Sequence, residues 1–200
     1  VMTGVGALVN TARISPGQSV AIFGMGGVGL CGLMGAKVSG AGTIIAVDLD
    51  DRKLAKAKAL GATHVFNASD PELLTKVRDL TGGGVDIAVE LAGAVAAMES
   101  AYAMTVRGGR IVTAGLSPIG AKFGFEHGDL VSNEKANIGS YMGSCVPVRD
   151  IPRFLNMYRT GALPVDQLVD SKIGFSKINE GFERLAAGEA LRQVLTPALA

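Results

Sequence analysis

The segment of residues 20–48 constrains the fold more than any other part of the chain. An apolar run (20–23) leads into the glycine-rich stretch 24–29, which is followed by small residues at helical spacing. A second apolar run (43–47) then ends on Asp48. This order of strand, glycine turn, helix, strand and acidic residue is the context in which the pattern G-x-G-x-x-G indicates a dinucleotide-binding site.

Each glycine of this turn has a physical role in such a site. Gly24 lets the chain leave the strand sharply where a β-carbon would clash, Gly26 lets the backbone approach a pyrophosphate, and Gly29 lets the helix pack closely on the strand. A helix that begins near Gly27 directs unpaired N–H groups and the positive end of its dipole at that pyrophosphate. The turn therefore predicts a bound dinucleotide, against the alternative of an ordinary glycine-rich connection.

The residue at the end of the second strand predicts which dinucleotide is bound. A carboxylate at Asp48 can accept hydrogen bonds from both hydroxyls of the adenosine ribose, whereas a 2′-phosphate there would meet a like charge. Asp50 and Asp51 add negative charge nearby, while Arg52 and Lys53 add positive charge. The balance favours NAD over NADP.

Strand-like and helix-like segments alternate through the first three quarters of the chain. Such alternation implies a parallel sheet with right-handed crossovers. The predicted strands are 20–23, 43–47, 63–66, 85–90, 110–114 and 137–142. We therefore expect an α/β fold, a doubly wound Rossmann sheet of six parallel strands flanked by helices. Residues 1–142 would form the NAD-binding domain, and residues 143–200 a C-terminal helical segment.

Composition excludes several classes of function. Hydrophobic residues make up 48% of the chain and charged residues 18%, so a large core is expected and disorder is not. The formal net charge of +1 and the lack of a basic stripe argue against nucleic acid or anionic membrane as a partner. Two cysteines and two histidines, none at ligand spacing, predict no metal site in this chain, and so little cysteine is compatible with a reducing cytoplasm.

Short motifs along the whole chain are similar to one known family. They are Thr3-Gly4, the glycine turn, Asp48 with Lys53 five residues on, Leu60-Gly61-Ala62-Thr63, Gly82-Gly83-Gly84-Val85-Asp86, Ile178-Asn179-Glu180-Gly181-Phe182 and Gly188-Glu189 with Arg192. These motifs resemble the coenzyme-binding half of the medium-chain, zinc-type alcohol dehydrogenases. Since that family carries its zinc ligands and most of its substrate pocket in a preceding domain, the resemblance implies that this chain, which opens on Val1-Met2, is a fragment.

The resemblance also implies a set of cofactor-binding residues. Gly24, Gly26, Gly27, Val28 and Gly29 would cradle the pyrophosphate, Asp48 and Lys53 would hold the ribose, and Arg192 would contact the pyrophosphate. The remaining positions implied around the adenine-to-nicotinamide channel and the nicotinamide are Thr3, Leu91, Ala92, Gly93, Ala114, Gly115, Ser140 and Met142. For several of these an ordinary structural role remains open: a helix cap for Thr3, core packing for Leu91 to Gly93, and a surface cation for Lys53 and Arg192.

The function implied is hydride transfer between a small alcohol or aldehyde and NAD(H), with zinc supplied by the missing half and no turnover by the fragment alone. Two alternatives stay open. One is a non-catalytic nucleotide-binding or dimerisation module. The other is a zinc-independent quinone or enoyl reductase that uses NADPH. The family pairs its sixth strand across a two-fold axis, so a homodimer through residues 137–142 is expected.

Overall fold

The computed structural model describes residues 1–197, which fall into two compact units, Val1–Leu163 and a second unit that begins at Pro164. The first unit contains a six-stranded sheet in the order β3-β2-β1-β4-β5-β6, and every neighbouring pair is parallel. Its strands are β1 (Ser19–Phe23), β2 (Thr43–Asp48), β3 (His64–Asn67), β4 (Val85–Glu90), β5 (Thr105–Thr113) and β6 (Ala136–Gly139). This is the strand order of a doubly wound Rossmann sheet, with its reversal between β1 and β4.

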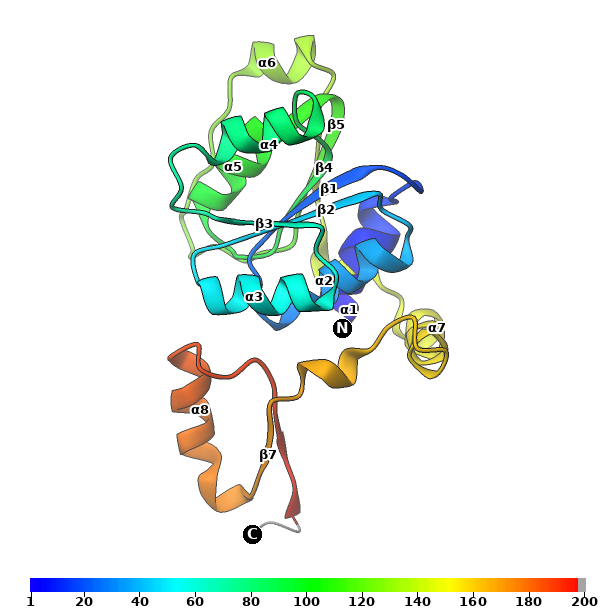
Figure 1. Ribbon diagram of the computed structural model, residues 1–200, viewed down its shortest axis with the longest axis vertical. Coiled ribbons are helices and arrows are strands. Elements are labelled where there is room, and N and C mark those ends of the chain that lie inside the picture. The colour runs from blue at the N-terminus through cyan, green and yellow to red at the C-terminus, as the bar shows by residue number, and fades with distance from the viewer. Residues whose placement is uncertain (198–200) are drawn as a thin grey trace. The chain divides into compact units, whose positions relative to one another are not determined.

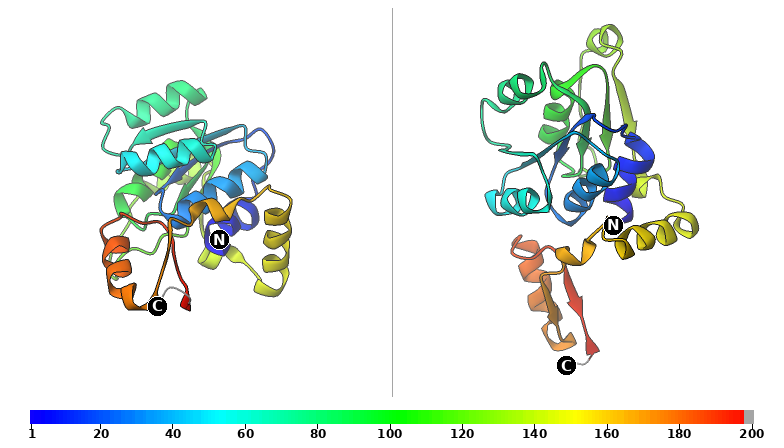
Figure 2. Two further views of the ribbon diagram at one scale, coloured as in Figure 1. Left: turned by 60° about the horizontal axis from the view of Figure 1, so that its bottom comes forward. Right: turned by 45° about the vertical axis from the view of Figure 1, so that its right-hand side comes forward.

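Helices cover both faces of this sheet, as Figure 1 shows and the views of Figure 2 confirm. One layer contains α4 (Leu73–Thr81) and α5 (Val95–Met104), and the other contains α1 (Met2–Gly6), α2 (Gly27–Val38) and α3 (Asp51–Leu60). A π-helical turn over Ala7–Ala12 continues α1. Alternate residues of the central strands face the two layers, so these strands are apolar throughout, as expected for a parallel sheet that is covered on both sides.

The core on the α4–α5 side is formed by side chains from four strands and two helices. Phe23, Val47 and Ile111 point into it from the sheet, and Val77 and Met98 reach it from the helices. These side chains are all at least 90% buried. Because the strands are short and fully packed, their carboxyl ends are held in fixed positions at one edge of the sheet.

Helix α6 (His127–Ser132) connects β5 to β6. After β6 the chain continues through a 3₁₀ turn over Tyr141–Ser144 into α7 (Pro147–Arg159). The second unit contains the strands β7 (Ser171–Ile173) and β8 (Gln193–Leu195), which pair in parallel, and the helix α8 (Ile178–Ala186) between them. Along residues 1–197 no helix has the length and apolar character needed to span a bilayer.

The predicted fold class is confirmed, and two details differ. Strand β6 ends at Gly139, because Met142 and Gly143 adopt left-handed backbone angles (φ of 49° and 71°) that no strand can contain. Strand β5 starts five residues earlier than predicted, at Thr105, because the turn around Arg107-Gly108-Gly109 is accommodated as an irregularity in its pairing with β4. The division at residue 142, which rests on the family resemblance, remains a prediction.

Candidate dinucleotide-binding groove

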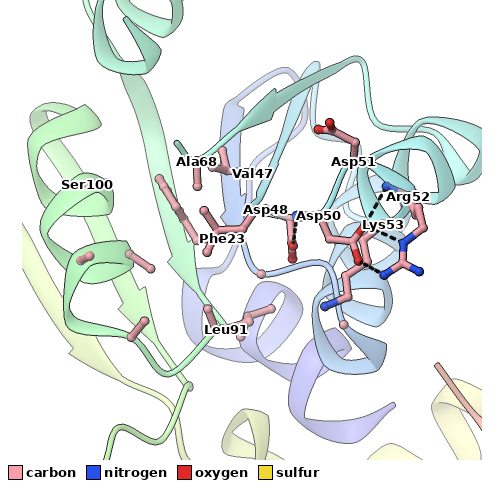
Figure 3. A pocket seen from close by; sticks show the side chains of 17 residues that line it. Phe23, Val47, Asp48, Asp50, Asp51, Arg52, Lys53, Ala68, Leu91 and Ser100 are labelled. Atoms are coloured by element: carbon pink, nitrogen blue, oxygen red, sulfur yellow. Dashed lines mark hydrogen bonds and ion pairs between the residues drawn. The ribbon is translucent and has the colours of Figure 1, made fainter. Parts of the chain in front are cut away.

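A groove of about 920 Å³ lies where the chain turns out of β1, β2 and β4, at the carboxyl edge of the sheet. Figure 3 shows its two sides: charged residues extend from the β2–α3 connection, and Leu91 and Ser100 lie on the opposite side. Ligands of doubly wound sheets bind at this point, where the strand order reverses. The groove is lined by Phe23, Gly24, Gly26, Val47, Asp48, Leu49, Asp50, Asp51, Arg52, Lys53, Ala68, Leu91, Ala92, Ala94, Ala96, Ala97 and Ser100.

The floor of the groove is the glycine turn between β1 and α2. Gly24 has a φ of +89°, and a β-carbon there would lie 2.9 Å from the backbone of Ala92. A β-carbon at Gly29 would overlap the carbonyl oxygen of Gly24. Both residues are therefore glycines because the fold requires it, Gly24 through its backbone angle and Gly29 through the close approach of α2.

Gly26 differs from these two glycines. Its φ of −73° is accessible to any residue, and a β-carbon there would meet no atom within 4 Å. It lines the groove and is the N-cap of α2, a helix of twelve residues whose first N–H groups lack intrahelical partners. Neither backbone angle nor packing accounts for glycine at this position, whereas a ligand that lies against the backbone would account for it.

Asp48 lies at the end of β2 with its carboxylate bonded to two backbone N–H groups. Oδ2 accepts from Met25 N at 2.5 Å, and Oδ1 accepts from Asp50 N at 2.9 Å. The first bond joins the end of β2 to the glycine turn and fixes the direction of the carboxylate. Since an ionised carboxylate has about four acceptor positions, two of them remain for hydroxyl donors in the groove.

Four charged residues, Asp50 to Lys53, follow Asp48 at the start of α3. The Arg52 guanidinium donates from Nε to Asp50 Oδ1 at 3.1 Å, and from a terminal nitrogen to Asp50 Oδ2 at 2.8 Å. Asp50 is also the N-cap of α3, accepting from Arg52 N at 2.9 Å. These hydrogen bonds to Arg52 lower the pKa of the Asp50 carboxyl to about 2. Lys53 lines the groove from the next position of the helix.

The opposite side rests on a buried carboxylate, Glu90, whose side chain is 2% exposed. Its Oε1 accepts from Ala92 N at 2.7 Å and Gly93 N at 2.6 Å, and its Oε2 accepts from the hydroxyl of Thr113 at 2.9 Å. One side chain thereby connects the segment that follows β4 with the last residue of β5. Small residues of α5 complete this side of the groove.

Of the cofactor-binding residues predicted from the sequence, Gly24, Gly26, Asp48, Lys53, Leu91 and Ala92 line the groove together. Gly27, Val28 and Gly29 form the first turn of α2 directly behind them. Gly93 and Gly115 touch each other so closely that a β-carbon on Gly115 would overlap Gly93 N. Ala114 N and Gly115 N both donate to the carbonyl oxygen of Glu90. Their binding roles remain predictions.

The other predicted residues lie outside the groove lining. Thr3 is in α1, and Ser140 is buried with its hydroxyl 2.7 Å from that of Thr11. Met142 is 46% exposed in the turn after β6. Arg192 belongs to the second unit, where its backbone N donates to Asp170 Oδ2 at 2.8 Å.

Sequence reasoning assigns no binding role to Glu90 or to the α5 residues of the groove. A single glutamate that ends an apolar strand carries no signal of its own, and alanines 94, 96 and 97 are common helix residues. Over the part of the chain that the structure describes, no three His, Cys, Asp or Glu side chains are grouped to hold a metal ion.

The fold and groove together define a Rossmann-type α/β domain, and comparisons with known proteins identify the family. Residues 27–160 match the family model described as zinc-binding dehydrogenase, and the chain belongs to that family.

Solved structures agree with this assignment. The chain is 34% identical to benzyl alcohol dehydrogenase from Acinetobacter calcoaceticus, with a TM-score of 0.93 over 97% of this chain and 53% of that one. It is 32% identical to an alcohol dehydrogenase from Aeropyrum pernix (TM-score 0.82, 98% and 55%). A zinc-binding dehydrogenase from Sinorhizobium meliloti 1021, solved with NADP bound, is 25% identical (TM-score 0.88, 98% and 58%). The chain thus spans about half the length of these relatives.

Proposed function

We propose that this chain is the NAD-binding part of a zinc-dependent alcohol dehydrogenase that transfers hydride between a small alcohol or aldehyde and NAD(H). The observation that carries the proposal is the open backbone at Gly26. The glycine lines the groove at the start of α2, and the space its missing β-carbon would fill is empty. A pyrophosphate in that space would receive backbone N–H groups at the positive end of the helix dipole.

Asp48 supports NAD over NADP as the cofactor. Its carboxylate is held in place by Met25 N and Asp50 N, so its remaining acceptor positions are oriented before any ligand arrives. Ribose hydroxyls can donate to such a carboxylate, whereas a 2′-phosphate placed against it would bring two negative charges together. The NADP-bound relative supports a nicotinamide cofactor in general, and the acid at Asp48 is the feature of this chain that supports NAD.

The residues of this chain would bind and orient the cofactor, which itself supplies the hydride chemistry when bound. Asp48 and Lys53 would hold the adenosine ribose, and the 24–29 turn would hold the pyrophosphate. Leu91, Ala92 and the carboxyl end of β5 would direct the nicotinamide. The catalytic zinc and the substrate pocket would come from a segment outside this chain, so we expect the chain alone to bind NAD(H) without oxidising alcohols.

A homodimer would complete the proposed assembly. Strand β6 (Ala136–Gly139) pairs with β5 on one side only, and its other edge carries backbone groups available to a second copy.

The cytoplasmic location expected from the sequence stays a prediction.

Titration of the chain with NADH, followed by nucleotide fluorescence, tests the proposal. We expect Asp48→Ala to weaken NADH binding at least about tenfold, because the two ribose hydroxyls lose a charged acceptor. Asp79→Ala, which removes an exposed carboxylate of α4 outside the groove, should leave the affinity unchanged. Equal affinities of wild type and Asp48→Ala would favour a module without a specific NAD site, and tighter binding of NADPH than of NADH would favour the reductase.

A further inference from the structure

Two adjacent cations at the start of α3 lie in different environments. Arg52 contacts Asp50 with two guanidinium nitrogens, at 3.1 and 2.8 Å. Lys53 forms no ion pair with any carboxylate of residues 1–197, and its side chain lines the groove. In Figure 3 the dashed contacts join Arg52 to Asp50, and Lys53 extends from the same helical turn on the side where Asp48 lies. Both cations line the groove, and Asp50 engages Arg52 in an ion pair.

The geometry of the Asp50–Arg52 contact is the one that guanidinium groups make with phosphates. Arg presents a planar fork of N–H donors that binds carboxylate or phosphate oxygens in pairs. Asp50 already occupies such a pair of donors on Arg52. Both residues line the groove together with Asp48, beside the position proposed for the adenosine ribose. A phosphate on the 2′-hydroxyl would therefore arrive next to a cation whose charge is already neutralised.

We propose that Asp50 is a second specificity-determining residue, which disfavours 2′-phosphorylated dinucleotides by holding Arg52 in an ion pair. The inference rests on the proposed function and extends it. Asp48 disfavours the 2′-phosphate by charge repulsion. Asp50 keeps the Arg52 guanidinium in an ion pair, so that this cation does not offset the repulsion by binding the phosphate. The chain thus contains a phosphate-binding cation that is engaged by its own neighbour.

Asp51 provides a matched control for the charge effect. It also lines the groove, and its carboxylate accepts from the side-chain amide of Asn67 at 2.8 Å. Asp50→Asn and Asp51→Asn remove the same charge, and the first removes the carboxylate that forms the bidentate ion pair with Arg52. Asn is as good an N-cap as Asp, so the Asp50→Asn variant keeps the cap of α3 and its fold.

The test measures NADH and NADPH affinities of the chain by fluorescence titration. We expect Asp50→Asn to strengthen NADPH binding about five- to tenfold, the size of one charge-assisted hydrogen-bonded contact, with NADH affinity changed less than about twofold. Asp51→Asn should move the NADPH affinity less than about twofold, because exposed charges are screened by solvent. Arg52→Ala should leave the NADPH affinity of the wild-type chain unchanged. Combined with Asp50→Asn, it should abolish the gain in NADPH affinity that Asp50→Asn produces.

Equal shifts in the Asp50→Asn and Asp51→Asn variants would show a general charge effect and overturn the inference. So would an unchanged NADPH affinity in Asp50→Asn, or a gain that survives the additional Arg52→Ala substitution. In each of these cases NADH binding by the wild-type chain would remain intact. A wild-type chain that binds neither nucleotide would instead overturn the proposed function, and this inference with it.

Discussion

The two sides of the groove use polar groups in opposite ways. On the β2–α3 side, charged groups are in contact with water: Arg52 has a side chain that is 71% exposed, and its partner Asp50 is 23% exposed. On the β4–β5 side, the carboxylate of Glu90 is buried and accepts three hydrogen bonds from the chain itself.

This contrast assigns ligand recognition to the β2–α3 side of the groove and stability of the fold to the β4–β5 side. An exposed charge exchanges its water for a ligand at little cost to the fold, so substitutions on the β2–α3 side should change what binds. A buried acceptor leaves its donors unsatisfied when it is removed, so substitutions on the β4–β5 side should change whether the domain folds. The glycine turn, where Gly24 abuts Ala92, is the point at which the two sides meet.

The largest expected effect is at this meeting point. Gly29→Ala should destabilise the domain by more than about 4 kcal/mol, because the new methyl group would overlap the Gly24 carbonyl oxygen and force α2 away from the turn. Gly26→Ala is the control, since its methyl group would enter empty space: the melting temperature should stay unchanged while NADH affinity falls at least about tenfold. Thermal unfolding and NADH titration measure both, and a loss of stability in Gly26→Ala would contradict a ligand-based role for that glycine.

An intermediate effect is expected on the buried side. Glu90→Leu should lower the free energy of unfolding by about 2–4 kcal/mol, because Ala92 N, Gly93 N and the Thr113 hydroxyl lose their acceptor. Glu99→Leu, the same substitution at an exposed position of α5, should change it by less than about 0.5 kcal/mol. Chemical denaturation of both variants gives the values, and similar losses would remove the distinction between the two sides.

The smallest effect concerns the exposed side and its pH dependence. Arg52 lowers the pKa of Asp50 from the ordinary 3.8 to about 2, so the stabilisation from this pair is complete above pH 3.8 and is lost as the pH falls through 2. The melting temperature of the wild-type chain should therefore decrease slightly more than that of Asp50→Asn between pH 5 and pH 2. Asp79→Asn, at an exposed carboxylate without this contact, should follow the wild-type curve. Parallel curves for wild type and Asp50→Asn would show that the pair contributes nothing measurable.

The regular elements of the first unit could be predicted because their signals are local. Apolar runs of strand length, glycines at strand ends and an acid directly after the second strand each depend on neighbours in sequence. Strand β8 and helix α6 escaped prediction. The three residues of β8 acquire strand geometry only by pairing with β7, and α6 is a six-residue helix with no buried side chain to set a periodic pattern.

The sequence by itself determined the βαβ order, the sharp turn at Gly24, the close packing at Gly29 and the acid that ends the second strand. These depend on steric limits and periodicities within a few residues. Only the tertiary structure decided that Glu90 is a buried acceptor shared by the loop after β4 and the end of β5. It also decided that Met25 N fixes Asp48 and that Asp50 engages Arg52. A carboxylate has the same formula whether it is exposed or buried, and its role follows from the donors that distant parts of the chain bring to it.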